Sequence, residues 1–255
     1  MSEPANTRGL AAGFGAYALW GLFPLLFVAL RPAGAWEILA NRILWTALLC
    51  AGVLLVLRDW AWIAPLRRQP RLMVGVTAAA LLIATNWVVY VAAVTSGHTS
   101  DAALGYFLNP LATVALGVLV LRERLRPLQW AAVTVGVVAG AYLALAAGSF
   151  PTTALALAIS FALYGLVKKK VGDTLPALHS LTLETVILSP AAAVILVIVA
   201  FTPAGLTFGD DAVHTGLLVF SGVATAVPLL LFAAAARRIP LVTIVFNDHL
   251  FGNVR

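Results

Sequence analysis

The sequence predicts an all-α, polytopic membrane protein. Of its 255 residues, 62% are hydrophobic and only 10% are charged, and the mean hydropathy is +1.00. A soluble domain has about 45–50% apolar and about 25% charged residues, so lipid must solvate most of this chain. Eight apolar segments approach the roughly 20 residues that a helical span needs. They cover residues 9–30, 36–57, 72–95, 101–121, 127–147, 150–167, 176–201 and 213–236.

A repeated motif predicts an internal duplication. Ala18–Leu22 reads ALWGL, and Ala162–Leu166 reads ALYGL. Five expected spans run from the first copy to the second, and because five is odd the second half starts on the opposite side of the membrane. This arrangement gives inverted-topology repeats, on which many transporters are built. The expected domains are 1–147, with five spans, and 148–255, with three spans and the start of a fourth.

The basic residues predict the orientation. All but three of the 16 lysines and arginines lie on one side of the expected membrane, which the positive-inside rule identifies as the cytoplasm. The N-terminus is therefore expected in the cytoplasm. The residues are Arg8, Arg58, Arg67, Arg68, Arg71, Arg122, Arg124, Arg126, Lys168, Lys169, Lys170, Arg237 and Arg238. Because these residues form short clusters between apolar runs, the net charge of +6 does not indicate nucleic-acid binding.

Arg42 and Glu184 are charged residues well inside expected spans. Such residues cost about 2.5–3.5 kcal/mol each on insertion scales and persist mainly where they face a bundle interior or a cavity. The alignment of the two halves makes them equivalent, so both are expected near a central site. Arg42 would bind an anionic group or pair with Glu184, and Glu184 could couple transport to protons. A purely structural ion pair is the alternative.

Further polar and aromatic side chains are candidates to line the same site. Glu37 lies near the outer end of the second span, where it can instead cap the helix. Asn109 precedes Pro110, which frees a backbone carbonyl inside a span. Hydrogen bonds between helices are the alternative for the polar candidates. The candidates are Tyr17, Trp20, Glu37, Asn86, Tyr90 and Asn109.

The sequence shows no motif of an enzyme. It contains no P-loop, nucleophile elbow, dinucleotide fingerprint or metal-ligand spacing, so no catalysis, metal or cofactor is expected. Gly136 and Gly140 form a GxxxG pair, which allows a homodimer but is more often used within one chain. Tryptophans near span ends, among them Trp87, are expected in the interfacial belt. The expected partners are the lipid bilayer and a small-molecule substrate.

Seven motifs follow one another in order over about residues 10–241. They are Ala18–Pro24, Glu37–Arg42, Asn86–Tyr90, Leu104–Leu111, Arg122–Leu125, Leu181–Thr185 and Pro228–Phe232. Together they resemble the RarD branch of the EamA-type drug/metabolite transporters. The resemblance implies a bacterial inner-membrane permease with ten helices in two inverted repeats. Two features depart from it: Asn41 stands where a histidine is expected, and the sequence after Leu241 does not continue into a ninth and a tenth helix.

The leading hypothesis is a secondary-active permease or exporter that moves a small polar or amphipathic metabolite or drug by alternating access. The alternative is a truncated, non-transporting remnant or an assembly subunit of such a permease. The substrate, the direction of transport and the coupling ion do not follow from the sequence.

Overall fold

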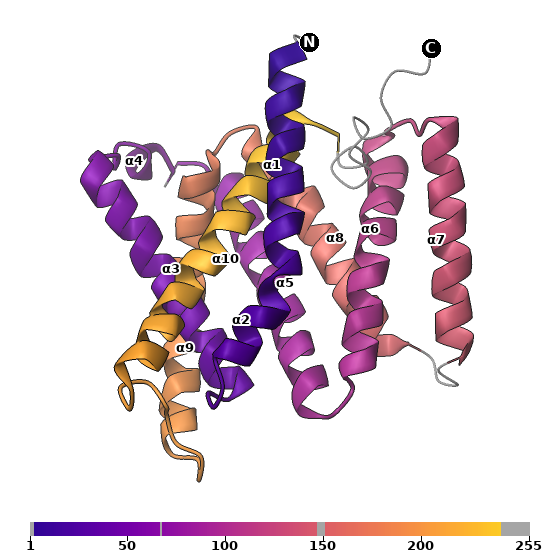
Figure 1. The fold of residues 1–255 in the computed structure, drawn as a ribbon. Coiled ribbons are helices and arrows are strands. Elements are labelled where there is room, and N and C mark those ends of the chain that lie inside the picture. The colour runs from indigo at the N-terminus through magenta and orange to yellow at the C-terminus, as the bar shows by residue number, and fades with distance from the viewer. Residues whose placement is uncertain (1–2, 67, 147–150, 241–255) are drawn as a thin grey trace.

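The computed structural model describes residues 3–66, 68–146 and 151–240, and every regular element in these ranges is a helix (Figure 1). The expected start of a ninth span, after Leu241, lies outside the described residues. The helices are α1 Glu3–Gly21, α2 Phe23–Ala29, α3 Ala35–Leu57, α4 Ile63–Leu66, α5 Pro70–Thr95, α6 Thr99–Leu121, α7 Pro127–Ala146, α8 Thr152–Gly172, α9 Ala177–Ala200 and α10 Ala212–Arg238.

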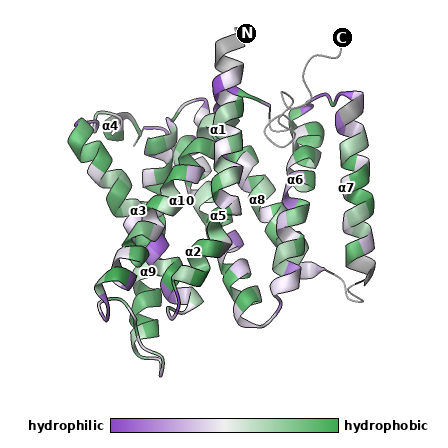
Figure 2. Ribbon diagram, in the orientation of Figure 1, coloured by the Kyte–Doolittle hydropathy of each residue, from purple (hydrophilic) through white to green (hydrophobic). Residues whose placement is uncertain are grey.

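The helices confirm the all-α, polytopic membrane fold. Within the described ranges, six helical segments are long and apolar enough to cross a membrane. They are Thr7–Ala29, Ala35–Leu57, Pro70–Thr95, Thr99–Leu121, Ala177–Ala200 and Ala212–Arg238. The other two expected spans correspond to α7, whose apolar stretch Gln129–Leu143 is shorter, and to α8, which continues to Gly172. Figure 2 shows hydrophobic ribbon along most of the helices, with hydrophilic residues mainly at their ends.

The first expected span, 9–30, is divided into two helices. α1 ends at Gly21 and α2 begins at Phe23, with Leu22 between them. A proline occupies the first turn of α2. Proline has no N–H to donate and its ring clashes with the carbonyl four residues earlier, so it favours a new helix start over a continuous helix.

Helices from the first part of the chain, α1 to α6, pack against helices from the second part, α8 to α10. α3 packs against α9 and α10, α1 packs against α10, and both α5 and α6 pack against α8. α7 contacts α6 at the edge of the bundle (Figure 1). In that contact Gly136 and Gly140 face Leu111 and Leu108 of α6, so the GxxxG pair is used within the chain. Whether the protein also forms a homodimer stays a prediction.

Gly222 of α10 is the closest point of the crossing between α3 and α10. A Cβ at this position would lie 2.5 Å from the Cβ of Trp45 and 2.6 Å from its carbonyl carbon. The Thr46 hydroxyl donates to the Gly222 carbonyl oxygen over 3.0 Å. The backbone of α3 therefore fills the space that any side chain at position 222 would need.

We expect Gly222→Ala to lower the free energy of unfolding by about 1–3 kcal/mol, because packed backbone cannot yield as a flexible side chain can. Gly216→Ala on the same helix is the matched control. A Cβ there meets no atom within 4 Å, and alanine favours a helix over glycine. Thermal unfolding of the purified protein in detergent measures both. Equal stability of the two variants would contradict the tight crossing.

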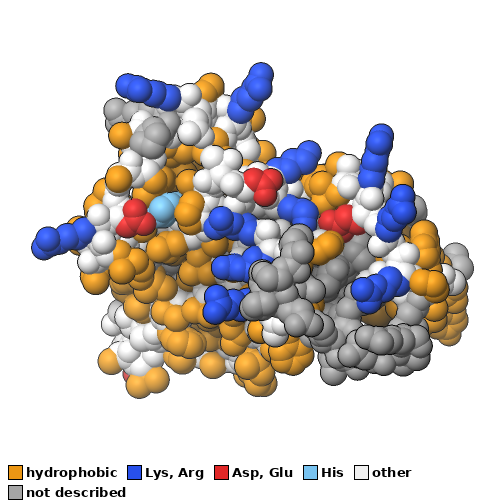
Figure 3. All heavy atoms as spheres, turned by 90° about the horizontal axis from the view of Figure 1, so that it is seen from above, with side chains coloured by type: hydrophobic (Ala, Val, Ile, Leu, Met, Phe, Trp, Pro, Cys, Tyr) orange, Lys and Arg blue, Asp and Glu red, His pale blue; other side chains and the backbone are white. Residues whose placement is uncertain are grey.

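The basic residues gather at one end of the bundle. Figure 3 looks onto the end that carries the N-terminus and shows many Lys and Arg side chains across it. The connection from α3 to α5, the connection from α6 to α7 and the ends of α8 and α10 lie at this end (Figure 1). The opposite end holds the acidic pair Asp210 and Asp211, directly before α10.

Candidate functional site

Arg42 lies in the first half of α3 and is buried, with 8% of its surface exposed. Its Nε donates a hydrogen bond to the Thr225 hydroxyl of α10 over 2.9 Å. Its guanidinium carbon is 5.0 Å from the ring centre of Phe23, 5.7 Å from that of Phe27 and 5.2 Å from that of Trp87. A cation over aromatic faces at these distances gains about 0.5–2 kcal/mol per ring, the larger value when it is desolvated. We call these five residues the arginine cluster.

The guanidinium of Arg42 has no acidic partner in the described part of the chain. Apart from the bond to Thr225, no described residue accepts a hydrogen bond from it. Of the two alternatives for Arg42, an anionic group or Glu184, the pairing with Glu184 is wrong, because Glu184 is paired with Lys168. A guanidinium carries five donors in a planar fork, and Thr225 occupies one. The Nη donors remain suited to a carboxylate or a phosphate.

Aromatic rings extend the arginine cluster toward α5 and α6. The ring of Phe27 lies 6.0 Å from that of Tyr90, which lies 5.5 Å from that of Tyr106. Tyr106 is about half exposed, with 47% of its surface accessible. The predicted site residues Arg42 and Tyr90 are thus in one continuous group, linked through Phe27.

Glu184 of α9 forms a second group with α8. Its Oε1 accepts hydrogen bonds from the Lys168 ammonium at 2.7 Å and from the Ser180 hydroxyl at 2.6 Å. Its Oε2 accepts a bond from the Tyr164 hydroxyl at 3.2 Å. All four residues are buried. We call them the lysine–glutamate cluster; the carboxylate is both paired and hydrogen-bonded, as a buried charge requires.

The position of Lys168 corrects the expectation that α8 ends at about residue 167. The helix continues to Gly172, and only 3% of Lys168 is exposed. Lys169 is partly exposed, and Lys170 is exposed. Of these three consecutive lysines, the first points into the bundle because Glu184 supplies its counter-charge.

Tyr17 and Trp20 join the lysine–glutamate cluster through a chain of aromatic ring contacts. The ring of Trp20 is 5.5 Å from that of Tyr17 and 5.7 Å from that of Phe232, which stacks on Tyr164 at 6.2 Å. Trp20 and Tyr164 are the aromatic residues of the two motif copies, and both contact Phe232. The Tyr17 hydroxyl is buried and has no hydrogen-bond partner among the described residues.

The three remaining candidates serve different contacts. The Asn86 amide donates to the Leu157 carbonyl oxygen at 2.9 Å and to the Ser160 hydroxyl at 3.1 Å, and so joins α5 to α8. The Asn109 side-chain oxygen is buried and has no hydrogen-bond partner in the described part of the chain. Glu37 accepts hydrogen bonds from the loop before α10 and lies in neither cluster. The structure thus gives Asn86 and Glu37 protein partners, and leaves Asn109 a free acceptor.

Sequence comparison assigns this chain to a known family. A profile of the EamA-like transporter family matches residues 7–146. Protein RarD of Streptomyces exfoliatus is 46% identical over 230 residues, which cover 89% of this chain and 71% of that protein. The chain belongs to the EamA-like transporter family. An uncharacterized transporter of Pseudomonas aeruginosa is 43% identical over 228 residues, covering 89% of this EamA-like transporter and 76% of the relative.

A solved crystal structure has the same fold as this EamA-like transporter. The two superpose with a TM-score of 0.68 over 94% of this chain and 83% of the other, at 17% sequence identity. At this identity the similarity concerns the fold alone. The membership of the family, by contrast, rests on the sequence matches.

Several residues of the two clusters in this EamA-like transporter were not predicted as site residues. They are Phe23, Phe27, Trp87, Tyr164, Lys168, Ser180 and Thr225. Trp87, expected in the interfacial belt, is 8% exposed and faces Arg42. For the lysine–glutamate cluster a signal existed: Tyr164 and Lys168 are four residues apart on one helix face, as are Ser180 and Glu184. A span that carries Glu184 requires such a partner.

Proposed function

We propose that this EamA-like transporter is a secondary-active permease of the bacterial inner membrane with a cytoplasmic N-terminus. It moves a small polar or amphipathic metabolite or drug by alternating access, and the arginine cluster binds an anionic group of the substrate. The observation that carries the proposal is Arg42: a buried cation that has aromatic contacts and one hydroxyl, but no carboxylate among the described residues.

The energetics of Arg42 favour an anionic ligand. Burying a charge without a partner is costly, so such a charge persists where a ligand or water completes it. A carboxylate or phosphate can accept two parallel bonds from the guanidinium fork. The rings of Phe23, Phe27 and Trp87 lie 5.0–5.7 Å from the guanidinium carbon and offer apolar surface beside it. An amphipathic anion matches this combination.

The contacts between helices support two halves, 1–147 and 148–255, related by inversion. If α1, α3 and α5 correspond to α8, α9 and α10, the contact of α1 with α10 corresponds to that of α8 with α5. Likewise, the contact of α3 with α10 corresponds to that of α9 with α5. The pair α3–α9 corresponds to itself. A site between such halves opens to either side as one half moves against the other.

Ligand binding to Arg42 can be measured by thermal stabilisation of the purified protein. The probes are small aromatic and aliphatic carboxylates and organic phosphates, each compared with its neutral amide or ester. We expect some anions to raise the unfolding temperature while their neutral counterparts do not. Arg42→Gln should abolish this shift, and Arg42→Lys, which keeps the charge without the fork, should weaken it about tenfold or more in apparent affinity.

Arg31→Gln serves as the matched control, because Arg31 is an exposed arginine in the loop before α3. It should leave the thermal shift unchanged. Stabilisation that persists in Arg42→Gln, or that neutral probes produce equally, would contradict the proposed role of Arg42.

Counterflow in proteoliposomes separates transport from the alternative of a non-transporting remnant or assembly subunit. Vesicles loaded with an unlabelled anion that stabilises the protein should accumulate the labelled anion, and Arg42→Gln should abolish the accumulation. Binding without counterflow would favour the alternative. Chemical conversion of the same anion in detergent would instead indicate an enzyme, which we do not expect.

A further inference from the structure

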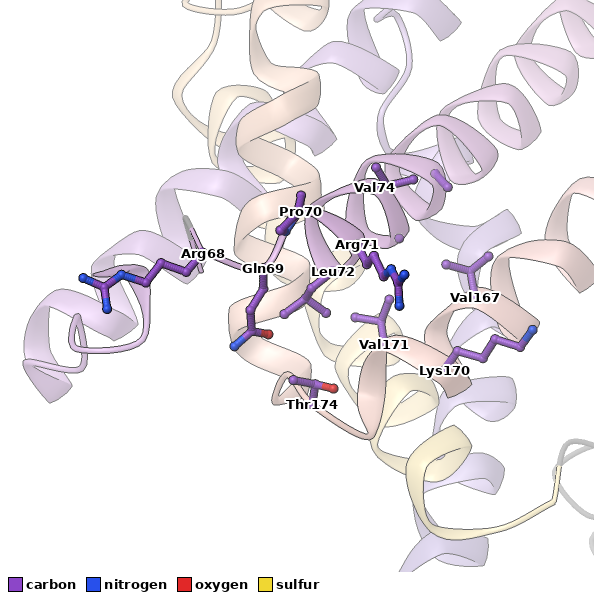
Figure 4. Close-up of a pocket in the computed structure, with 12 residues that line it drawn as sticks. Arg68, Gln69, Pro70, Arg71, Leu72, Val74, Val167, Lys170, Val171 and Thr174 are labelled. Carbon is purple, nitrogen blue, oxygen red and sulfur yellow. The ribbon is translucent and has the colours of Figure 1, made fainter. Parts of the chain in front are cut away.

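A hollow of about 650 Å³ lies between α5 and α8, at the basic end of the bundle. It is separate from the two clusters, because none of their residues lines it. Its walls are the first turns of α5 and the last turns of α8 (Figure 4). Six of its lining residues carry the argument: Arg71, Val74, Ala78, Val167, Lys170 and Val171.

One part of the hollow is lined by apolar side chains and reaches the outer surface of the bundle. Val74, Ala78, Val167 and Val171 line it, and 69% of the surface of Val74 is exposed. From Gln69 to Ala78, α5 advances roughly 13 Å at 1.5 Å per residue. One leaflet has a hydrocarbon depth of about 15 Å, half the bilayer core. The hollow is therefore long enough to hold much of an acyl chain.

The mouth of the hollow is basic. Arg68, Arg71 and Lys170 are exposed, and none of them has an ion pair or a hydrogen bond from its side chain to a described residue. Among the described residues, no Asp or Glu lines the hollow. Figure 4 shows Arg71 and Lys170 on opposite walls, one from α5 and one from α8, whereas Arg68 extends away from the hollow. Arg71 and Lys170 therefore bring one positive charge to each of the two walls.

We propose that this hollow binds one acidic phospholipid. Its phosphate lies between Arg71 and Lys170, and one acyl chain follows Val74, Ala78 and Val167. Basic pockets between membrane helices on the cytoplasmic side are suited to acidic headgroups. A free phosphate would use only the mouth, and a neutral lipid only the apolar wall. A lipid with a net negative charge uses both.

Native mass spectrometry of the full chain with equal amounts of phosphatidylglycerol and phosphatidylcholine, matched in acyl chains, tests the proposal. We expect one phosphatidylglycerol to be retained in preference to phosphatidylcholine. Each basic side chain near an acidic headgroup contributes about fivefold, so Arg71→Gln with Lys170→Gln should lower this preference roughly 25-fold. Ala78→Phe should lower retention of phosphatidylglycerol by filling the apolar part.

The matched control, Arg122→Gln with Arg124→Gln, removes two exposed charges at the same end but away from the hollow. It should keep the preference, and the unfolding temperature of each variant reports whether it folds. An equal loss of the preference for phosphatidylglycerol in the control would overturn the proposal, because it would show that any basic residues at this end attract the acidic lipid. Displacement of the lipid by inorganic phosphate at equal concentration would overturn it in favour of a site for the free anion.

Discussion

Replacing Lys168 by methionine is expected to destabilise the protein by about 3–5 kcal/mol, because it leaves the Glu184 carboxylate buried without its counter-charge. Lys168 and Glu184 are 3% and 1% exposed, and the ammonium lies 2.7 Å from Oε1. Ser180 and Tyr164 still donate to the carboxylate, but neutral hydroxyls do not replace an opposite charge. Thermal unfolding of the protein in detergent measures the loss.

The double variant Lys168→Met with Glu184→Leu shows whether the loss of stability in Lys168→Met comes from the unpaired carboxylate or from changed side-chain packing. Removing both charges avoids the unpaired carboxylate, so the double variant should be more stable than Lys168→Met alone. Lys169→Met is the control on the neighbouring residue. Its ammonium is 3.6 Å from the Glu123 carboxylate and donates to the Ile239 carbonyl oxygen at 2.9 Å, and its side chain is 26% exposed. An ion pair that is open to solvent contributes about 1 kcal/mol or less, so this variant should lose less stability than Lys168→Met. If the loss of stability in the double variant equals the sum of the losses in Lys168→Met and Glu184→Leu, the two residues are not coupled.

The sequence was sufficient to predict the membrane fold, because long apolar segments have few alternatives in lipid. It was also sufficient to single out Arg42 and Glu184 as charged residues inside expected spans, since such residues are rare. It did not predict their partners. The pairing of these two residues rested on their equivalent depth in the two halves, and depth does not determine which way a side chain points around the helix axis.

The partners of the two clusters depend on helix rotation and contact. Thr225 meets Arg42 across 183 positions of sequence, through the crossing that Gly222 permits one turn away. Lys168 belongs to a run of three lysines that reads as a cytoplasmic boundary, and only the packing of α8 on α9 shows that the first of them faces inward. The contacts within one helix, Tyr164 with Lys168 and Ser180 with Glu184, follow from local spacing. The contacts that join different helices do not.

Replacing Glu37 by alanine is expected to lower the free energy of unfolding by about 2–4 kcal/mol and to release the loop between α9 and α10. The carboxylate is 1% exposed and accepts bonds from the backbone N–H groups of Thr207 and Phe208, each at 2.9 Å. Its other oxygen accepts the Thr207 hydroxyl at 2.9 Å. Hydrogen bonds to a charged group contribute about 1.5–3 kcal/mol, and the alanine variant leaves these donors without an acceptor. Thermal unfolding and hydrogen exchange at residues 207 and 208 measure the effect.

Two controls separate the loop contact from the charge of Glu37. Glu37→Gln keeps an oxygen that can accept both backbone N–H groups, so it should retain most of the stability and the protection from exchange. Asp101→Ala removes another carboxylate from the first turn of a helix, where the helix dipole contributes only about 0.3–1 kcal/mol. If Glu37→Gln were as damaging as Glu37→Ala, the negative charge would matter more than the acceptor. The anion-induced thermal shift that depends on Arg42 gives a separate test of the role of Glu37. If this shift survives in Glu37→Gln, Glu37 lies outside the binding site and belongs to the scaffold that holds α3 against α10.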